Sequence, residues 1–129
     1  MCSTGKEEEL AYYQSTDTLL LVYSLLARGF LSGKLHSDDP STHKVLDKAS
    51  KRAYFYSDNL AKLHRIEEIA SSLGISVPAL TIAYLTHKNG VIIPSIGSGS
   101  ASRIEGNLDA ANIDLDEATM RQLDGIAAS

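Results

Sequence analysis

The sequence predicts an α/β protein built around a parallel sheet, and two apolar runs carry this prediction. The runs Leu19–Tyr23 and Val91–Ile93 are continuously apolar, without the alternation of polar and apolar residues that a half-buried strand shows. Such runs are typical of strands that are buried on both faces, as in parallel sheets. Segments with helical periodicity come before, between and after the two runs. This is the element order of a sheet flanked by helices.

Composition restricts the class of protein before any motif is considered. The chain has 129 residues, 43% of them hydrophobic, which suits one globular domain over residues 1–129. Its 12 basic and 16 acidic side chains give a formal charge of −4, so we expect neither a nucleic acid nor an anionic membrane as partner. No apolar run reaches the length of a membrane span, and the N-terminal residues lack the pattern of a signal peptide. The single cysteine, Cys2, allows no internal disulfide and favours a reducing, cytoplasmic location.

Two helices are predicted between the apolar runs. Ser57 or Asp58 is the expected N-cap of the first, and Gly74 ends it. Ser76 is the expected N-cap of the second, with Pro78 in its first turn. The first helix has a clear apolar face, formed by Leu60, Leu63, Ile66, Ile69, Ala70 and Leu73.

Two further helices are predicted near the ends of the chain. Residues Glu7–Tyr13 form the first, with acidic residues in the first turn, where the helix dipole favours them. Asp116 is the expected N-cap of the last helix, and Leu115 is placed to contact Met120 as a hydrophobic staple.

The remaining polar segments are interpreted as solvent-facing. Residues Leu35–Ser57 are long and polar, and a loop of this length is usually functional or partly disordered. The pairs Asp38-Asp39 and Glu67-Glu68 are expected to face solvent. The four histidines show no metal-ligand spacing, and Cys2 has no neighbour that would activate it as a nucleophile.

The segment Gly90–Asn107 has the pattern of a strand, a glycine-serine loop and a helix. Ser100 is a plausible N-cap, and Ile104, Leu108 and Ala111 follow at helical spacing. This order directs free backbone N–H groups towards the end of the strand, as in many phosphate sites. Two interpretations remain open: a phosphate site that uses Arg103 in the first helical turn, and an ordinary turn with a surface arginine.

Two strands are too few for a stable parallel sheet. Strands that are apolar on both sides need neighbours, and this chain supplies only two such runs. The sequence therefore looks like part of a larger domain.

Four segments resemble the C-terminal part of the aldo-keto reductase family. Residues 22–34, VYSLLARGFLSGK, are similar to the segment after the seventh barrel strand, and residues 91–107, VIIPSIGSGSASRIEGN, to the segment after the eighth. NLAKLHRIEEIASSLGISVPALTIAYLTHK resembles the region of the seventh helix, and NIDLDEATMRQLDGI resembles the C-terminal helix. The resemblance covers nearly the whole chain, from about Glu7 onward.

The resemblance implies the C-terminal portion of a (β/α)8 TIM barrel, from about helix six: an incomplete barrel of two parallel strands with flanking helices. It also implies NADP as cofactor, with NAD possible, and hydride transfer to aldehydes or ketones. The family's catalytic tyrosine, lysine, aspartate and histidine come from the first half of the barrel and have no matching positions here. We therefore expect no catalytic residue and no metal ligand in this chain.

The resemblance assigns cofactor-binding positions in the segment that follows the first strand. Tyr23 matches the aromatic position that stacks on the nicotinamide, although a core tyrosine at a strand end is the alternative. Ser24 and Leu26 match positions that touch the ribose and the pyrophosphate. Arg28 and Lys34 lie on a loop that the family folds over the pyrophosphate, and both could instead be surface charges.

A second set of positions follows the second strand. Gly97, Ser98 and Gly99 match the loop that receives the adenosine 2′-phosphate. Arg103 and Asn107 match the arginine and asparagine that bind the adenosine.

Three residues depart from the family pattern. Leu25 replaces a proline, which suggests a looser turn. Gly99 stands where many members have a basic residue beside the 2′-phosphate, and Gly106 stands where an acidic residue usually reaches the adenine. The last two leave the choice between NADP and NAD open.

Two hypotheses of function follow. The first is the cofactor-binding part of an aldo-keto reductase, inactive by itself, which acts on a small carbonyl substrate only if the rest of the barrel is supplied. The second is a non-catalytic remnant of the family that binds a dinucleotide or pairs with another chain. Because the two strands lack neighbours, we also expect the chain to self-associate through its barrel-facing surface.

Overall fold

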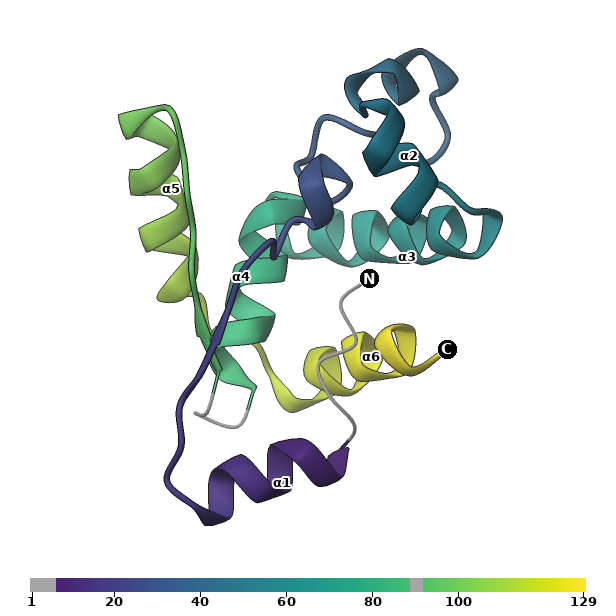
Figure 1. The fold of residues 1–129 in the computed structure, drawn as a ribbon. Coiled ribbons are helices and arrows are strands. Elements are labelled where there is room, and N and C mark those ends of the chain that lie inside the picture. Colours follow the sequence, from purple (N-terminus) through teal and green to yellow (C-terminus); the bar gives the residue numbers. More distant parts are fainter. Residues whose placement is uncertain (1–6, 89–91) are drawn as a thin grey trace.

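The computed structural model describes residues 7–88 and 92–129 (Figure 1). Its elements are helix-rich, with two short strands. In chain order they are α1 (Glu7–Ser15), β1 (Leu20–Val22), η1 (Ala27–Gly29), η2 (Pro40–Val45), α2 (Lys48–Tyr54), α3 (Ser57–Leu73), α4 (Val77–His87), β2 (Ile92–Pro94), α5 (Ala101–Ala111) and α6 (Glu117–Ala128).

The two strands form a parallel pair, which confirms the predicted α/β class with a parallel sheet. Leu20 lies opposite Ile92, and Leu21 lies opposite Ile93. The pair is not buried on both faces, so this part of the prediction is wrong. Ile92 is buried and α4 packs against β2, whereas Leu21 is 67% exposed. The reason is that only one face of the sheet has a helix against it. Val91, the start of the predicted second strand, lies outside the described residues.

The core lies on the other side of α4 from α5 (Figure 1). Its buried side chains come from η1, α3, α4 and α6, and from the segments around them. The fully enclosed members are Phe30, Leu35, Leu63, Leu80 and Ile126. We call η1, α2, α3, α4 and α6 together the helical body.

The segment Leu35–Ser57 is ordered, so its prediction as a long loop is wrong. It contains η2 and α2, and its apolar residues Leu35 and Leu46 are buried. Each helix is capped by an aspartate: Asp39 accepts a hydrogen bond from the Ser41 N–H at 2.9 Å, and Asp47 accepts one from the Ser50 N–H at 2.6 Å. Helical periodicity is hard to see over such short elements, which explains the error.

The predicted helix caps can be compared with the helix ends of the structure one by one. Gly74 has the left-handed conformation that ends α3, and Ser76 and Asp116 accept N-cap hydrogen bonds for α4 and α6, all as predicted. The N-cap of α3 is Tyr56, not Ser57 or Asp58, and it makes no side-chain capping bond.

The prediction that Glu67 faces solvent is also wrong. The Glu67 carboxylate is only 18% exposed, because it accepts hydrogen bonds from the N–H and the hydroxyl of Ser37. This contact ties the segment that precedes η2 to the middle of α3.

Helix α5 begins after Ser100, as predicted, but Ser100 makes no side-chain capping bond. Ile104 and Leu108 are both exposed, and the buried side chain of this helix is that of Ala110 rather than Ala111. The apolar stripe that predicted the helix is therefore largely exposed, although α5 packs against α4.

No single helix of the described chain is long and apolar enough to cross a membrane. The helices α3 and α4 pass the same test of length and composition only as a pair, bent by 91°.

Candidate functional site

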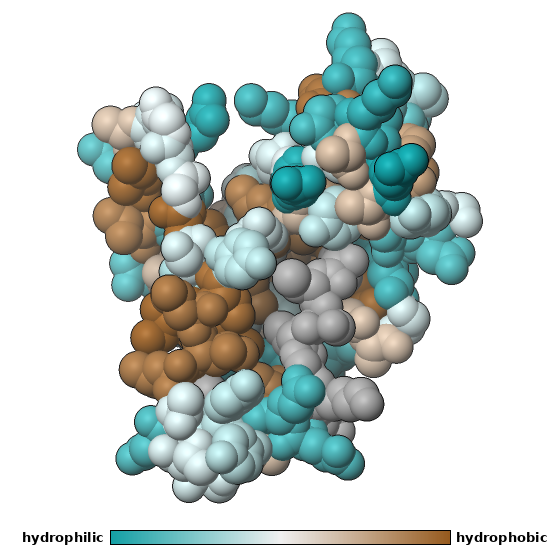
Figure 2. Space-filling view, in the orientation of Figure 1, coloured by the Kyte–Doolittle hydropathy of each residue, from teal (hydrophilic) through white to brown (hydrophobic). Residues whose placement is uncertain are grey.

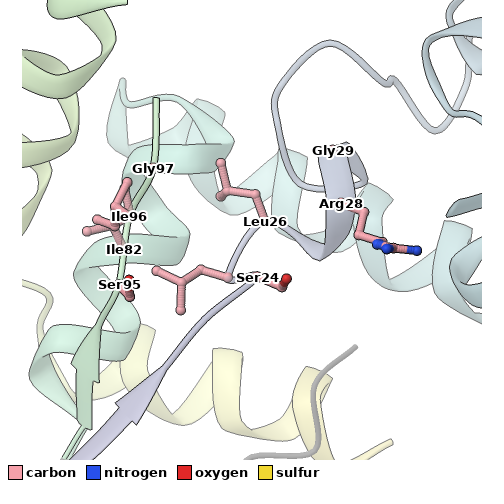
Figure 3. A pocket seen from close by; sticks show the side chains of 9 residues that line it. Ser24, Leu26, Arg28, Gly29, Ile82, Ser95, Ile96 and Gly97 are labelled. Carbon is pink, nitrogen blue, oxygen red and sulfur yellow. The ribbon is translucent and has the colours of Figure 1, made fainter. Parts of the chain in front are cut away.

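A cavity of about 180 Å³ lies where the chain leaves the carboxyl ends of β1 and β2 (Figure 3). Since the two strands are parallel, the segments that follow them meet at the same edge of the sheet. Ile82 of α4, which is fully buried, also lines the cavity. The other lining residues are Ser24, Leu25, Leu26, Arg28, Gly29, Ser95, Ile96 and Gly97.

The segment after β1 forms a tight and unusual turn. Ser24, Ala27 and Arg28 have φ values of 57°, 47° and 54°. Residues other than glycine rarely adopt this backbone conformation. The turn is closed by the Ala27 N–H, which donates to the Ser24 carbonyl at 2.9 Å. Leu25, which replaces the family's proline, therefore does not prevent the turn from closing. Backbone outliers of this kind cluster at functional sites, since the surrounding fold must hold them in place.

The two segments are joined directly. The Ser95 N–H donates to the Val22 carbonyl at 2.7 Å, which continues the pairing of the strands by one step. This bond sets the position of the chain from Ser95 to Gly97 relative to Ser24.

The side chain of Arg28 points away from Ile96 and Gly97 (Figure 3). It lies near the N-terminus of α2, where hydrogen bonds from Ser50 and then the charge of Arg28 hold the pKa of Asp47 below its usual 3.8. The main chain of Arg28 lines the cavity, but its charge is directed elsewhere. This geometry favours the surface-charge interpretation of Arg28 over a contact with pyrophosphate.

The loop before α5 is organised by serine hydroxyls. The Ser98 hydroxyl accepts from the Ser100 N–H at 3.2 Å, and the hydroxyls of Ser100 and Ser102 are 3.0 Å apart. A Cβ atom built on Gly97 or Gly99 meets nothing within 4 Å. The loop therefore offers hydroxyl groups and open space, rather than an enclosed pocket.

Arg103 lies in the first turn of α5 and is exposed. Within the described residues, its guanidinium forms no ion pair with a carboxylate. An unpaired cation beside free N–H groups and serine hydroxyls can bind an anion. Asn107 is half-buried one turn further along the same helix.

The structure brings four of the ten predicted cofactor positions into one cavity: Ser24, Leu26, Arg28 and Gly97. The other six lie outside its lining. Tyr23 is 79% exposed on the open side of the sheet, and Lys34 is exposed beyond η1. The remaining four, Ser98, Gly99, Arg103 and Asn107, belong to the loop before α5 and to that helix.

Five lining residues were not among the predicted site residues: Leu25, Gly29, Ile82, Ser95 and Ile96. Ser95 and Ile96 directly follow the second apolar run, so their place at a strand end was a usable signal. The place of Ile82 in the cavity could not be predicted, because in the sequence an apolar helix residue that lines a cavity looks the same as one in the core.

The described lining of the cavity contains none of the usual proton donors and acceptors. Its nine lining residues include no carboxylic acid, histidine, tyrosine or lysine, which are the usual general acids and bases. The described residues also contain no group of three His, Cys, Asp or Glu side chains arranged to hold a metal ion.

One ionised cluster lies elsewhere, between α4 and α6. Lys88 donates to the Tyr84 hydroxyl and to Asp124, both at 2.8 Å, and the Tyr84 hydroxyl donates to Asp124 at 2.5 Å. Burial raises the pKa of Tyr84, and its hydrogen bond to Asp124 adds to this. Burial disfavours the charged forms of Lys88 and Asp124. The hydrogen bonds within the cluster outweigh this effect, so the pKa of Lys88 is raised and that of Asp124 is lowered. These hydrogen bonds join α4 and the residue that follows it to α6.

The parallel strands, their flanking helices and the cavity define an α/β protein with a cavity at the carboxyl ends of its strands, the edge at which such folds bind ligands. The sequence profile of the Aldo/keto reductase family matches residues 1–128, and the chain belongs to this family. The fold of this family is a TIM barrel, and two parallel strands with flanking helices are consistent with part of one. Its members use nicotinamide cofactors and act on carbonyl substrates.

Similar proteins of Schizosaccharomyces pombe support the assignment. One whose name places it among the aryl-alcohol dehydrogenases is 27% identical over 119 residues, which are 92% of this chain and 33% of that protein. An aldo-keto reductase whose name specifies NADP(+) is 29% identical over 107 residues, 81% of this chain and 31% of that protein. The chain thus spans about a third of the length of the curated relatives that it matches.

Proposed function

We propose that this chain is the cofactor-binding, C-terminal part of an NAD(P)H-dependent aldo-keto reductase barrel, and that it is inactive by itself. The whole barrel would reduce an aldehyde or ketone by hydride transfer. The observation that carries the proposal is the cavity formed by the segments after β1 and β2, the edge at which barrel enzymes bind their ligands. The second half rests on the resemblance to the family, whose catalytic tyrosine, lysine, aspartate and histidine have no matching positions in this chain.

The size of the cavity determines which part of a dinucleotide it can hold. Ligand pockets commonly measure about 300–1,000 Å³, and this cavity of about 180 Å³ is smaller. It fits a single portion of the cofactor, beside Ser24 and Leu26. The rest would extend over the serine loop to Arg103, where hydroxyl groups and an unpaired cation suit a phosphate. When bound, the cofactor supplies the hydride, whereas the residues of this chain bind and orient it.

The binding half of the proposal is tested by titrating the chain with NADPH and NADH in a calorimeter. Arg103→Ala should weaken binding by about tenfold or more, because a hydrogen bond to a charged group contributes about 1.5–3 kcal/mol. The loss should be greater for NADPH if Arg103 faces the 2′-phosphate. Arg65→Ala is a matched control, since Arg65 is also exposed but lies on α3. A folded chain that binds neither dinucleotide would contradict the proposal.

The catalytic half is tested with the purified chain, NADPH and a general aldehyde. We expect no oxidation of NADPH, because general acid catalysis worth about 10²–10⁴-fold has no donor in the cavity. Saturable turnover that Tyr23→Phe abolishes would overturn this expectation.

A second function is favoured by the same lining residues. A cavity that can bind but not transfer protons also suits a non-catalytic remnant that holds a dinucleotide or pairs with another chain. A longer transcript that encodes further barrel strands with a tyrosine and a lysine would favour the reductase. Dinucleotide binding by a chain that is never joined to such strands would favour the remnant.

A further inference from the structure

Three consecutive residues beside the candidate site have a left-handed main chain. Ala27, Arg28 and Gly29 have φ values of 47°, 54° and 97°, and Arg28 and Gly29 line the cavity (Figure 3). Glycine adopts this conformation readily, but in alanine and arginine it is strained. The surrounding structure must therefore hold this part of the cavity wall in place.

The segment at the start of α2 packs against this turn. Leu46 is buried, and a Cβ atom built on Gly29 would lie 3.8 Å from its Cδ2 atom. Ser50 is 2% exposed, and its hydroxyl donates to the Arg28 carbonyl at 3.4 Å, which is long for a hydroxyl donor. Within the described residues, no other hydrogen bond reaches this carbonyl. The Ser50 hydroxyl therefore joins α2 to the cavity wall.

The side chain of Arg28 is drawn to the same turn of α2. Asp47, the N-cap of that helix, accepts a hydrogen bond from the Ser50 N–H at 2.6 Å. The Arg28 guanidinium is close enough to interact with the negative charge of this carboxylate. Both ends of Arg28 are thus attracted to α2, the carbonyl by a hydroxyl and the guanidinium by a carboxylate.

Helix α6 has the same cap without the link to another element. Asp116 accepts from the Thr119 N–H at 2.7 Å, and Thr119 is 9% exposed. In both helices the hydroxyl three residues after the aspartate also interacts with that carboxylate. Of the two hydroxyls, only that of Ser50 also binds another element of the described chain. The bond to Arg28 is therefore not a part of the cap itself.

We propose that Ser50 is a positioning residue for the cavity, and that it acts by holding the Arg28 carbonyl and with it the left-handed wall. Ser50 is not in the cavity lining, so it would touch no ligand itself. Without its hydroxyl the wall is free to leave the strained conformation. The cavity is then formed for a smaller fraction of the time, and the apparent affinity falls by that fraction. The inference rests on the proposed function for the identity of the ligand, a nicotinamide dinucleotide.

The first test measures amide hydrogen exchange without any cofactor, in Ser50→Ala and in the matched control Thr119→Val. The N–H groups of Gly29 and Leu31 both donate to the Leu26 carbonyl at 3.0 Å, so they report whether the turn is closed. Relative to the amides of α4, Ser50→Ala should speed their exchange about three- to tenfold, the effect of one hydrogen bond. Thr119→Val should change the turn and α4 equally. A turn that exchanges no faster than α4 in Ser50→Ala, or one that Thr119→Val opens as much, overturns the proposal.

The second test is calorimetric titration with NADPH. Ser50→Ala should weaken binding by about three- to tenfold, whereas Thr119→Val should leave the dissociation constant unchanged. Equal dissociation constants in Ser50→Ala and the unaltered chain would overturn the positioning role. If the unaltered chain does not bind NADPH, the proposed function fails, while the exchange rates still decide whether Ser50 holds the turn.

A rescue variant keeps the test decisive if Ser50→Ala does not fold. Glycine needs no support in the left-handed region, so Arg28→Gly should make the Ser50 hydroxyl dispensable. The double variant Arg28→Gly/Ser50→Ala should fold, and its turn should exchange as slowly as in Arg28→Gly alone. If the second substitution opens the turn as much as it does beside Arg28, the hydroxyl acts elsewhere and the proposal is overturned.

Discussion

The helical body and the exposed apolar side of the sheet and α5 contain the same types of residue in opposite environments (Figure 2). We call the second region the open face; it consists of Leu19, Leu21, Tyr23, Ile93, Ile104 and Leu108. Leu80 on α4 is fully buried, whereas Leu21 on β1 is 67% exposed. The helices of the body pack on one another around one core, whereas the apolar sides of the β1–β2 pair and α5 stay largely exposed among the described residues. A hydrophobic pattern therefore predicts that a segment packs against another apolar surface, but it does not show that this surface belongs to the same chain.

The two regions also differ in the interactions that they contain. The body contains most of the side-chain caps, the Tyr84–Lys88–Asp124 cluster and the enclosed core. The candidate site lies between the body and the open face, at the ends of the strands. Changes of the same kind in the two regions should therefore have very different effects.

The largest difference is expected from removing a leucine side chain. Leu80→Ala should lower the free energy of unfolding by about 2–5 kcal/mol, because a cavity forms in the core. Leu21→Ala should change it by less than about 0.5 kcal/mol at concentrations where the chain is monomeric, since an exposed side chain leaves no cavity. Urea denaturation at low and high protein concentration measures both. Equal losses in the two variants at low concentration would show that Leu21 is buried in the isolated chain.

The next comparison replaces two loop glycines, Gly33 after η1 and Gly99 before α5. Gly33 has a φ of +73°, and a Cβ atom there would lie 3.2 Å from Cδ of Pro78, so Gly33→Ala should cost about 1–3 kcal/mol. Gly99 has neither a positive φ nor a neighbour within 4 Å, so Gly99→Ala should be neutral or stabilise the chain by up to about 1 kcal/mol. Thermal melting measures both changes. A destabilising Gly99→Ala would mean that this loop is more closely packed than the structure shows.

A smaller difference separates two serines at the same helical position. Ser76→Ala should cost about 1 kcal/mol, because the Ser76 hydroxyl accepts from the Ala79 N–H at 3.2 Å. Ser100→Ala should cost only a few tenths of a kcal/mol, since Ser100 makes no capping bond to α5. Both values come from denaturation curves. If the two variants lost the same stability, Ser100 would cap α5 in solution.

The smallest effect is expected from the ionised cluster of the body. The pKa of Asp124 is lowered, so its contribution to stability is complete above its usual 3.8 and is lost as the pH falls through the lowered value. The pKa of Lys88 and that of Tyr84 are raised, so their contribution is complete below their usual 10.5 and 10.0 and is lost as the pH rises through the raised values. Lys88→Met should cost about 0.5–1 kcal/mol near neutral pH, because Asp124 is half-exposed.

Melting temperatures across the pH range test this linkage. The alkaline loss of stability should become shallower in Lys88→Met, whereas Leu21→Ala should keep the pH profile of the unaltered chain. An unchanged alkaline limb in Lys88→Met would assign the loss to other groups.

Much of the fold was accessible from the sequence because it depends on neighbours along the chain. The α3 and α4 helices, the left-handed Gly74 and the caps at Ser76 and Asp116 all followed from local patterns. The short η2 and α2 elements did not, because six or seven residues are too few to show a periodicity. The role of Glu67 was also missed, since its partner Ser37 lies 30 residues earlier in the chain.

The features of the candidate site also fall into those that the sequence predicted and those that it did not. The strand ends and the serine loop were recognisable, because glycine, serine and β-branched residues have strong local preferences. The left-handed turn at Ser24, Ala27 and Arg28 was not, since these residue types do not favour that conformation and only the packing around them holds it. The direction of the Arg28 side chain and the place of Ile82 in the cavity wall could not be predicted from the sequence either.

Local patterns in the sequence were enough to predict both strands, most of the helices and many of their ends, and to identify the family. The tertiary structure alone decided which apolar residues are buried. Leu20 and Leu21 are adjacent and identical in type, yet one is half-buried and the other is exposed. The physical reason is that secondary structure arises from local backbone preferences, whereas burial requires a second surface. For Leu21 and its neighbours on the open face, the described residues supply none.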